Sequence, residues 1–148
     1  MGSNMPGHYD SSQSLLEAAV HALDAKGLTV VRKSKWRQTA AWPNPEDPGF
    51  VNGVVIVESQ LYPLELLYRL HAIERAFGRE RRAPNAARTL DLDLIAFGRT
   101  ISNEPLLPHP RAHQRRFVMG PLAEIAPDWV HPTLGQTAAE LAATAKIG

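Results

Sequence analysis

Apolar and polar residues alternate along the chain between residues 89 and 95. The apolar positions are Leu90, Leu92 and Leu94, and the polar ones are Thr89, Asp91 and Asp93. A period of two is typical of a half-buried β-strand, so we expect a strand over 89–97. Such a strand places both aspartates on one face, roughly 6–7 Å apart.

Two longer stretches, 11–26 and 63–77, repeat apolar residues at helical spacing, and Gly27 and Gly78 stop them. Their stripes are Leu15, Leu16, Ala19, Val20 and Leu23, and Leu66, Leu67, Leu70, Ile73 and Phe77. An alanine-rich segment, 138–146, predicts a last helix. We therefore expect three main helices.

Further strands are expected at 28–36 and 50–58, with a short one at 117–119 before a helical turn at 122–125. The apolar run inside 50–58 favours an interior strand covered on both faces. Loops are expected at 40–49 and through Pro105, Pro108 and Pro110. Helices and strands mixed without strict alternation predict an α+β layered domain spanning 1–148.

The composition is that of one globular domain. The 148 residues are 44% hydrophobic and 21% charged, with a net charge of +1, so an electropositive site must be local. There are no cysteines, which excludes disulfides and thiolate metal sites and fits a cytoplasmic protein. No apolar run is long enough for a membrane span, and we expect no membrane or nucleic-acid partner.

The aspartate pair adds chemistry to this picture. Like charges so close repel each other, so a cation is their natural partner, and oxygen ligands favour Mg²⁺ over zinc. Guanidinium groups suited to phosphate lie just upstream, at Arg75, Arg79, Arg81, Arg82 and Arg88. Together these features suggest nucleotide phosphate chemistry.

Four segments in order carry a family resemblance. They are Gly2-Ser3-Asn4; Thr39 with Phe50-Val51-Asn52; Ile73-Glu74 with Arg79, Arg81 and Arg88-Thr89-Leu90-Asp91-Leu92-Asp93; and Leu107-Pro108-His109-Pro110-Arg111 with Arg115-Arg116-Phe117-Val118. The chain resembles 6-hydroxymethyl-7,8-dihydropterin pyrophosphokinase, a folate-pathway enzyme that converts ATP and a pterin alcohol to AMP and the pterin diphosphate. The resemblance implies a ferredoxin-like sandwich with a mostly antiparallel sheet, and a monomer.

The resemblance also implies roles for single residues. Asp91 and Asp93 would hold two Mg²⁺ ions on the triphosphate, and Arg79 and Arg88 would close over it from the catalytic loop. The implied ATP contacts are His71, Glu74, Arg81, His109 and Arg115, with Glu74 at the rim of the core stripe. The implied pterin contacts are Thr39, Trp42, Phe50, Asn52 and Phe117.

The chain departs from the family in three places. The family has a strand before Gly-Ser-Asn, whereas this chain begins at Met1, so we expect the first strand to be truncated and the sheet interior to be open. The alternative explanation for this N-terminus is that Met1-Gly2-Ser3 derives from an expression vector. Asn85-Ala86-Ala87 replaces a usual Trp-Gly-Pro, and the segment after Thr39 lacks a usual proline. Both changes concern the lid more than the metal chemistry.

Two other functions remain open on the sequence. One is a non-enzymatic nucleic-acid-binding module that uses the basic loop, although the Gly-aromatic motif of ferredoxin-like RNA binders is missing. The other is a degenerate relative that binds ATP without turnover. Release of AMP that requires pterin and Mg²⁺ would distinguish the enzyme from both.

Overall fold

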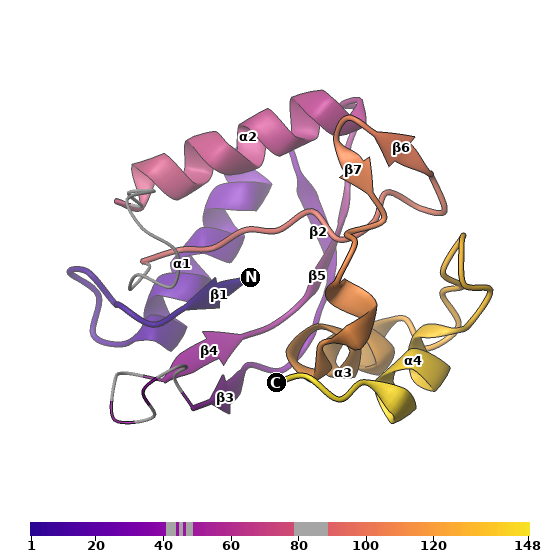
Figure 1. Cartoon of the computed structure of the whole chain (residues 1–148). Helices are drawn as coiled ribbons and strands as arrows, with labels where there is room; N and C mark the ends of the chain where they lie inside the picture. The colour runs from indigo at the N-terminus through magenta and orange to yellow at the C-terminus, as the bar shows by residue number, and fades with distance from the viewer. Residues whose placement is uncertain (41–43, 45, 47–48, 79–88) are drawn as a thin grey trace.

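The computed structural model describes residues 1–148 except 41–43, 45, 47–48 and 79–88. Within this part of the chain, helices pack on short antiparallel strand pairs, which confirms the predicted α+β class. Figure 1 shows α1 (Ser12–Ala25) and α2 (Pro63–Ala76) on one side, with α3 (Arg116–Ile125) and α4 (Ala138–Thr144) on the other. The strands of residues 50–58 and the segment after residue 89 run between them.

The two long helices begin and end where their sequence signals lie. The Ser11 side chain accepts a hydrogen bond from the Ser14 backbone N–H and caps α1. Gly27, with a φ of +84°, follows α1, and Gly78, at +83°, follows α2. Both predicted helices are therefore confirmed to within a residue or two.

In the described part of the chain, the strands form three small sheets. Their bounds are β1 (Gly2–Ser3), β2 (Thr29–Lys33), β3 (Arg37–Thr39), β4 (Phe50–Asn52), β5 (Val55–Glu58), β6 (Ser102–Asn103) and β7 (Leu106–Leu107). One sheet has the order β1-β4-β3, the second pairs β2 with β5, and the third pairs β6 with β7. All these pairings are antiparallel, as predicted. The β6–β7 hairpin lies where the sequence predicted only a proline loop.

Both predicted long strands are interrupted. The 28–36 strand ends at Lys33 and resumes as β3, while the 50–58 strand divides into β4 and β5 around Gly53. A side chain on Gly53 would collide with the Trp36 ring, so the two breaks lie against each other. The expectation of a fully covered interior strand is also wrong. The residues of β5 are half-buried or exposed, and in the described chain β5 pairs only with β2.

The prediction of a regular strand over 89–97 is wrong. The described part of this segment has one isolated antiparallel bridge, from Asp91 to Gly2, and no continuous ladder. Its burial still alternates: Leu90 is 0% exposed and Leu92 5%, whereas Asp91 is half-buried and Asp93 exposed. The alternating pattern therefore predicts correctly which side chains are buried, but it does not predict how the backbone pairs.

The C-terminal part is helical. The predicted strand at 117–119 is wrong, because these residues lie inside α3, which also includes the predicted helical turn at 122–125. Before α3, a short 3-10 helix covers Ala112–Gln114. The last helix is confirmed as α4, two residues shorter than predicted, and a capping box between Thr137 and Glu140 starts it.

Two hydrophobic clusters lie on opposite sides of the strands. The first joins α1, α2 and the leucines of the 89–97 segment, and the second joins α3, α4 and the short 3-10 helix. Val54 and Ile95 pack on the second cluster, so the chain passes from one cluster to the other. None of the described helices is long and apolar enough to cross a membrane.

Candidate active site

The site begins with three residues that lie side by side across the sheet. Gly2 is the register partner of Asn52 in β4 on one side and of Asp91 on the other. The bridge to Asp91 is a reciprocal pair of hydrogen bonds, 2.9 Å from the Gly2 N–H and 2.8 Å from the Asp91 N–H. Residues opposite each other in antiparallel pairs project to the same face. Asn52 and Asp91 therefore share a face, with the side-chain-free Gly2 between them.

Gly2 leaves room that Asn52 fills. A Cβ atom on Gly2 would lie 2.6 Å from the Asn52 Oδ1 atom, so the amide extends over the glycine toward the aspartate side. Adjacent strands are about 4.8 Å apart, which puts the Asn52 and Asp91 backbones roughly 10 Å apart.

Asp93 extends this face toward His109. It lies two residues after Asp91 and is exposed. Two residues further on, the Ile95 carbonyl accepts a hydrogen bond of 2.8 Å from the His109 N–H. The backbone bond fixes His109 beside the end of the aspartate pair.

Charges on both sides act on His109. Burial lowers its pKa below the ordinary 6.5, opposed by the carboxylate of Asp93 and, more weakly, by that of Asp91. Arg115 and Arg111 lower it further. The net direction of the pKa shift is downward, which favours the neutral imidazole of His109. The charges of Asp91, Asp93 and Arg115 act on His109, so these residues lie near one another. All four are predicted site residues.

Glu74 has a different place from the one predicted. It is 1% exposed, so its expected position at the rim of the core is wrong. Its Oε2 atom accepts a 2.8 Å hydrogen bond from the Leu92 N–H, the peptide group between the two aspartates. Sequence could have indicated this, because Glu74 follows Leu70 by one turn inside the buried stripe. The buried Glu74 side chain therefore holds the backbone between Asp91 and Asp93 from the core side.

Three predicted pterin contacts lie on the same face as the aspartates. Thr39 is the register partner of Phe50, and Asn52 follows Phe50 by two residues, so all three project to one side. Arg37 pairs with Asn52 on this face, and its guanidinium lies against Gly120 of α3. The face with the predicted contacts is therefore the one that α3 partly covers.

Phe117 is presented from the first turn of α3. The Arg115 guanidinium lies over its ring, 5.7 Å from the centroid, and Gly148 packs so closely that a Cβ there would be 2.7 Å from a ring carbon. Two predicted contacts of different substrates, Arg115 and Phe117, are thus in direct contact. This pair could stack a flat ligand beside a phosphate-binding guanidinium.

The structure gives less information on the remaining predicted residues. His71 is half-buried on α2, three residues before Glu74. Four predicted residues lie outside the described part of the chain: Trp42, Arg79, Arg81 and Arg88. Their roles stay predictions.

Sequence reasoning missed Arg37. Its guanidinium donates to Glu124 at 3.1 Å, while the other Glu124 oxygen accepts the Lys35 N–H at 2.8 Å. These bonds tie α3 to β3 and to the segment just before β3. An arginine in a short polar strand carries no signal for this contact, since its partner is 87 residues away.

The donor set fits a magnesium ion that is shared with a ligand. In the described ranges no group of three or more histidine, cysteine or acidic residues is clustered as for an all-protein metal site. Asp91 and Asp93 supply carboxylate oxygens from one face. Mg²⁺ is commonly held by one or two carboxylates together with substrate phosphates and water. The residues present therefore fit such an ion, with nucleotide phosphates completing its coordination.

Comparison with known proteins decides the family. A family model described as 7,8-dihydro-6-hydroxymethylpterin-pyrophosphokinase (HPPK) matches residues 1–127. The chain belongs to this family. The resemblance seen in the sequence is thereby confirmed, and the face with Asp91, Asp93 and Asn52 is the candidate active site of an HPPK-family domain.

Named relatives agree with the HPPK assignment. The 2-amino-4-hydroxy-6-hydroxymethyldihydropteridine pyrophosphokinase of Synechocystis sp. is 43% identical over 144 residues, covering 95% of this chain and 71% of that protein. The protein of the same name in Methylorubrum extorquens is 37% identical over 132 residues, 88% of this chain and 82% of that one. The folic acid synthesis protein fol1 of Pneumocystis carinii is 35% identical over 119 residues, 79% of this chain but 16% of that longer protein.

Proposed function

We propose that the chain transfers pyrophosphate from ATP to 6-hydroxymethyl-7,8-dihydropterin, yielding AMP and the pterin diphosphate, in folate biosynthesis. The observation that carries the proposal is the shared face of Asp91, Gly2 and Asn52. It sets carboxylates for a metal–triphosphate beside an amide and aromatic rings suited to a heterocycle. Membership of the HPPK family supports the same reaction.

The chemistry is an in-line displacement on the β phosphorus of ATP. The hydroxymethyl oxygen forms a bond to that phosphorus, the bond to the oxygen bridging the α and β phosphates breaks, AMP leaves, and the hydroxyl proton is released. Positioning and charge neutralisation supply most of the catalysis in phosphoryl transfer, and we extend this to the pyrophosphoryl group. When bound, two Mg²⁺ ions would neutralise phosphate charge and align the leaving oxygen.

The protein side chains divide between the two substrates. Asp91 and Asp93 would hold the metal ions, while His109, Arg115, Arg81 and His71 would contact ATP. Thr39, Asn52 and Trp42 would hydrogen-bond or cover the pterin, and Phe50 and Phe117 would stack on it. Arg79 and Arg88 would close over the triphosphate. Glu74 acts in this scheme as a positioning residue, through its bond to the Leu92 N–H.

The test is product analysis with a matched substrate. We would incubate the protein with ATP, Mg²⁺ and 6-hydroxymethyl-7,8-dihydropterin and separate AMP from ADP. We expect AMP and pterin diphosphate in equal amounts, and none without pterin, with EDTA, or with 6-methyl-7,8-dihydropterin, which lacks only the attacking hydroxyl. Formation of ADP, or AMP release that does not need the pterin hydroxyl, would contradict the proposal.

Three further parts of the proposal rest on the sequence. They are a ferredoxin-like strand order, a monomeric state and a cytoplasmic location. Sedimentation at micromolar concentration tests the second, with a mass near 16.3 kDa expected for a monomer. Cell fractionation tests the third.

A further inference from the structure

Arg37 stands at the end of a row of side chains that crosses the sheet. The backbone pairings run from Asp91 to Gly2, from Gly2 to Asn52 and from Asn52 to Arg37. Register partners in antiparallel strands project to the same face, with Cβ atoms about 5 Å apart. The Arg37 side chain therefore starts beside the Asn52 amide, on the face that carries Asp91. The proposed function gives it no role.

The Arg37 guanidinium meets α3 at two points. Its Nη2 atom donates to Glu124 at 3.1 Å. Its Nη1 atom lies against Gly120, where a Cβ atom would be only 2.7 Å away. Glycine is among the least favourable residues inside a helix, so its place at position 120 indicates close packing. Gly120 thus leaves the room that the guanidinium occupies.

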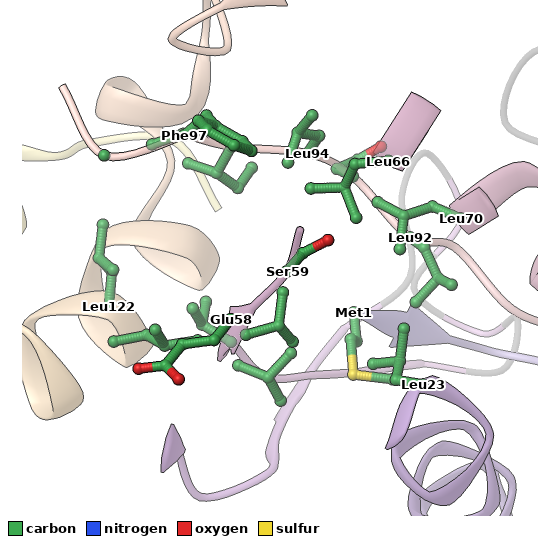
Figure 2. Close-up of a pocket in the computed structure, with 18 of the residues that line it drawn as sticks. Met1, Leu23, Glu58, Ser59, Leu66, Leu70, Leu92, Leu94, Phe97 and Leu122 are labelled. Atoms are coloured by element: carbon green, nitrogen blue, oxygen red, sulfur yellow. The ribbon is translucent and has the colours of Figure 1, made fainter. Parts of the chain in front are cut away.

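Both contact points share a face of α3 with Phe117. Phe117, Gly120 and Glu124 follow one another at intervals of three and four residues, which places them along one stripe of the helix. Leu122 lies two residues from Gly120 and from Glu124, and residues at that spacing do not share a face. Figure 2 shows Leu122 at the apolar cavity between β5 and the 92–98 segment. The helix therefore turns the Phe117 stripe toward Arg37 and a different face toward the cavity.

The ion pair contributes more to geometry than to stability. Its Arg37 and Glu124 side chains are 47% and 27% exposed, and ion pairs so open to solvent add little to the free energy of unfolding. The same end of α3 is also held from β2, because the Arg32 guanidinium donates to the Ile125 carbonyl at 2.7 Å. We therefore expect the fold to persist when Arg37 is replaced, with a change in how the Phe117 stripe lies over the sheet.

We propose that Arg37 is a positioning residue for the heterocycle. Through Glu124 and Gly120 it sets the spacing between α3 and the sheet, and with it the width of the slot between Phe117 and the β4 residues Phe50 and Asn52. The inference rests on the proposed function, which assigns these three residues to the pterin. A flat ligand that stacks on an aromatic ring needs that ring at a fixed spacing, so the slot width decides the affinity.

Two substitutions change the contact in different ways. Arg37→Met removes the guanidinium and keeps a long side chain, whereas Gly120→Ala fills the room under it and keeps both charges. Titration calorimetry would measure the affinity for 6-hydroxymethyl-7,8-dihydropterin with Mg²⁺ and saturating α,β-methylene-ATP, whose bridging carbon prevents transfer. We expect both variants to bind the pterin at least about fivefold more weakly, because small errors in position are costly. Affinity for the nucleotide analogue should not change.

Two controls separate positioning from loss of stability. Lys33→Met removes the second ion pair in the described part of the chain, which joins Lys33 to Glu17 at 2.8 Å with similar exposure, and should leave pterin affinity unchanged. Alanine favours a helix more than glycine does, so the urea midpoint of Gly120→Ala should not fall. Weaker pterin binding in that variant would then come from position alone.

A double substitution tests whether the effect passes through Phe117. Phe117→Leu removes the ring, and Arg37→Met added to it should weaken pterin binding much less than it does in the wild-type chain. An equal loss in both backgrounds, or unchanged pterin affinity in Arg37→Met and Gly120→Ala, would overturn the inference alone. A wild-type chain that binds no pterin would instead remove the proposed function, and the inference with it.

Discussion

At the scale of the residue, the candidate site depends on which way single side chains point. Leu90 and Leu92 enter the first hydrophobic cluster, while the aspartates between and after them face outward. Glu74 holds the intervening peptide group from within the core. The same few residues thus belong to the core and to the site, and substitutions can separate the two roles.

Replacement of either carboxylate by asparagine tests the metal role. We expect Asp91→Asn and Asp93→Asn each to slow pterin-dependent AMP formation at least about 100-fold, because a metal ion supplies several kcal/mol and each 1.36 kcal/mol is tenfold. Steady-state rates at several Mg²⁺ concentrations provide the measurement. The exposed Asp128, as Asp128→Asn, is the matched control. Unchanged activity in both site variants would reject this role.

We predict that Glu74 positions the peptide group of Leu92 and does not bind ATP. Leucine at position 74 leaves the buried Leu92 N–H without this acceptor, which costs about 1–3 kcal/mol of unfolding free energy. Glutamine keeps an acceptor and should restore most of the stability. Urea unfolding and the KM for ATP would be measured on both variants.

The ATP measurement distinguishes the two roles. Glu74→Gln with wild-type stability and wild-type KM supports positioning. A large rise in KM for ATP at wild-type stability would favour the direct ATP contact expected from the sequence.

At the scale of the element, the sequence predicted three of the described helices closely, whereas it located β2, β4 and β5 without showing where these strands break or end. The helices α1, α2 and α4 carry local signals, namely spaced apolar residues, caps and stop glycines, that need no distant partner. Strands depend on pairing with remote segments, so the breaks after Lys33 and Asn52 and the missing ladder over 89–97 leave no local trace. In α3, packing against α4 prevails over the strand propensity of Phe117 and Val118.

The start of α4 offers a test of one such signal. Thr137→Ala removes the hydroxyl that accepts the Glu140 N–H and half of the capping box, at a cost of about 1 kcal/mol. Ala138 and Leu141 of this helix are buried against α3, so the loss should appear in global thermal unfolding. Ser12→Ala, next to the cap of α1 but not the cap itself, is the control. Equal melting temperatures for the two variants would contradict the expected role of the cap.

At the scale of the whole molecule, the site could be predicted as a set of residues but not as an arrangement. The ordered motifs of the family indicated Asp91, Asp93, His109 and Asn52, and the structure places Asn52 and Asp91 on either side of Gly2 and Asp93 near His109, while their roles stay predictions. Their placement depends on the pairing of Gly2 with two remote partners, and no local pattern shows that. The tie between Arg37 and Glu124 is of the same kind.

Protonation of the buried His131 should make the stability of the fold sensitive to acid. Burial, and then the neighbouring His113, lowers the pKa of His131 below its ordinary 6.5, and its Nδ1 atom accepts the N–H groups of Thr133 and Leu134. Since the unfolded chain binds this proton more readily, the free energy of unfolding should fall as pH drops below about 6.5.

Urea unfolding at pH 7.5 and pH 5.5 measures this dependence. His131→Asn should lose less stability between the two pH values than the wild-type chain, while the exposed His21→Asn should match the wild type. His109 contributes in the same direction to all three proteins, so it cancels in the comparison. An unchanged slope in His131→Asn would contradict the prediction.

The alternation at 90–93 also restricts how the chain length can vary. Deletion of one residue between Leu90 and Asp93 would turn a carboxylate into the leucine-lined interior and a leucine out to solvent. Core and reactive groups would then be lost together, in a single step. We therefore expect folded and active variants, natural or engineered, to have no insertion or deletion between Leu90 and Asp93.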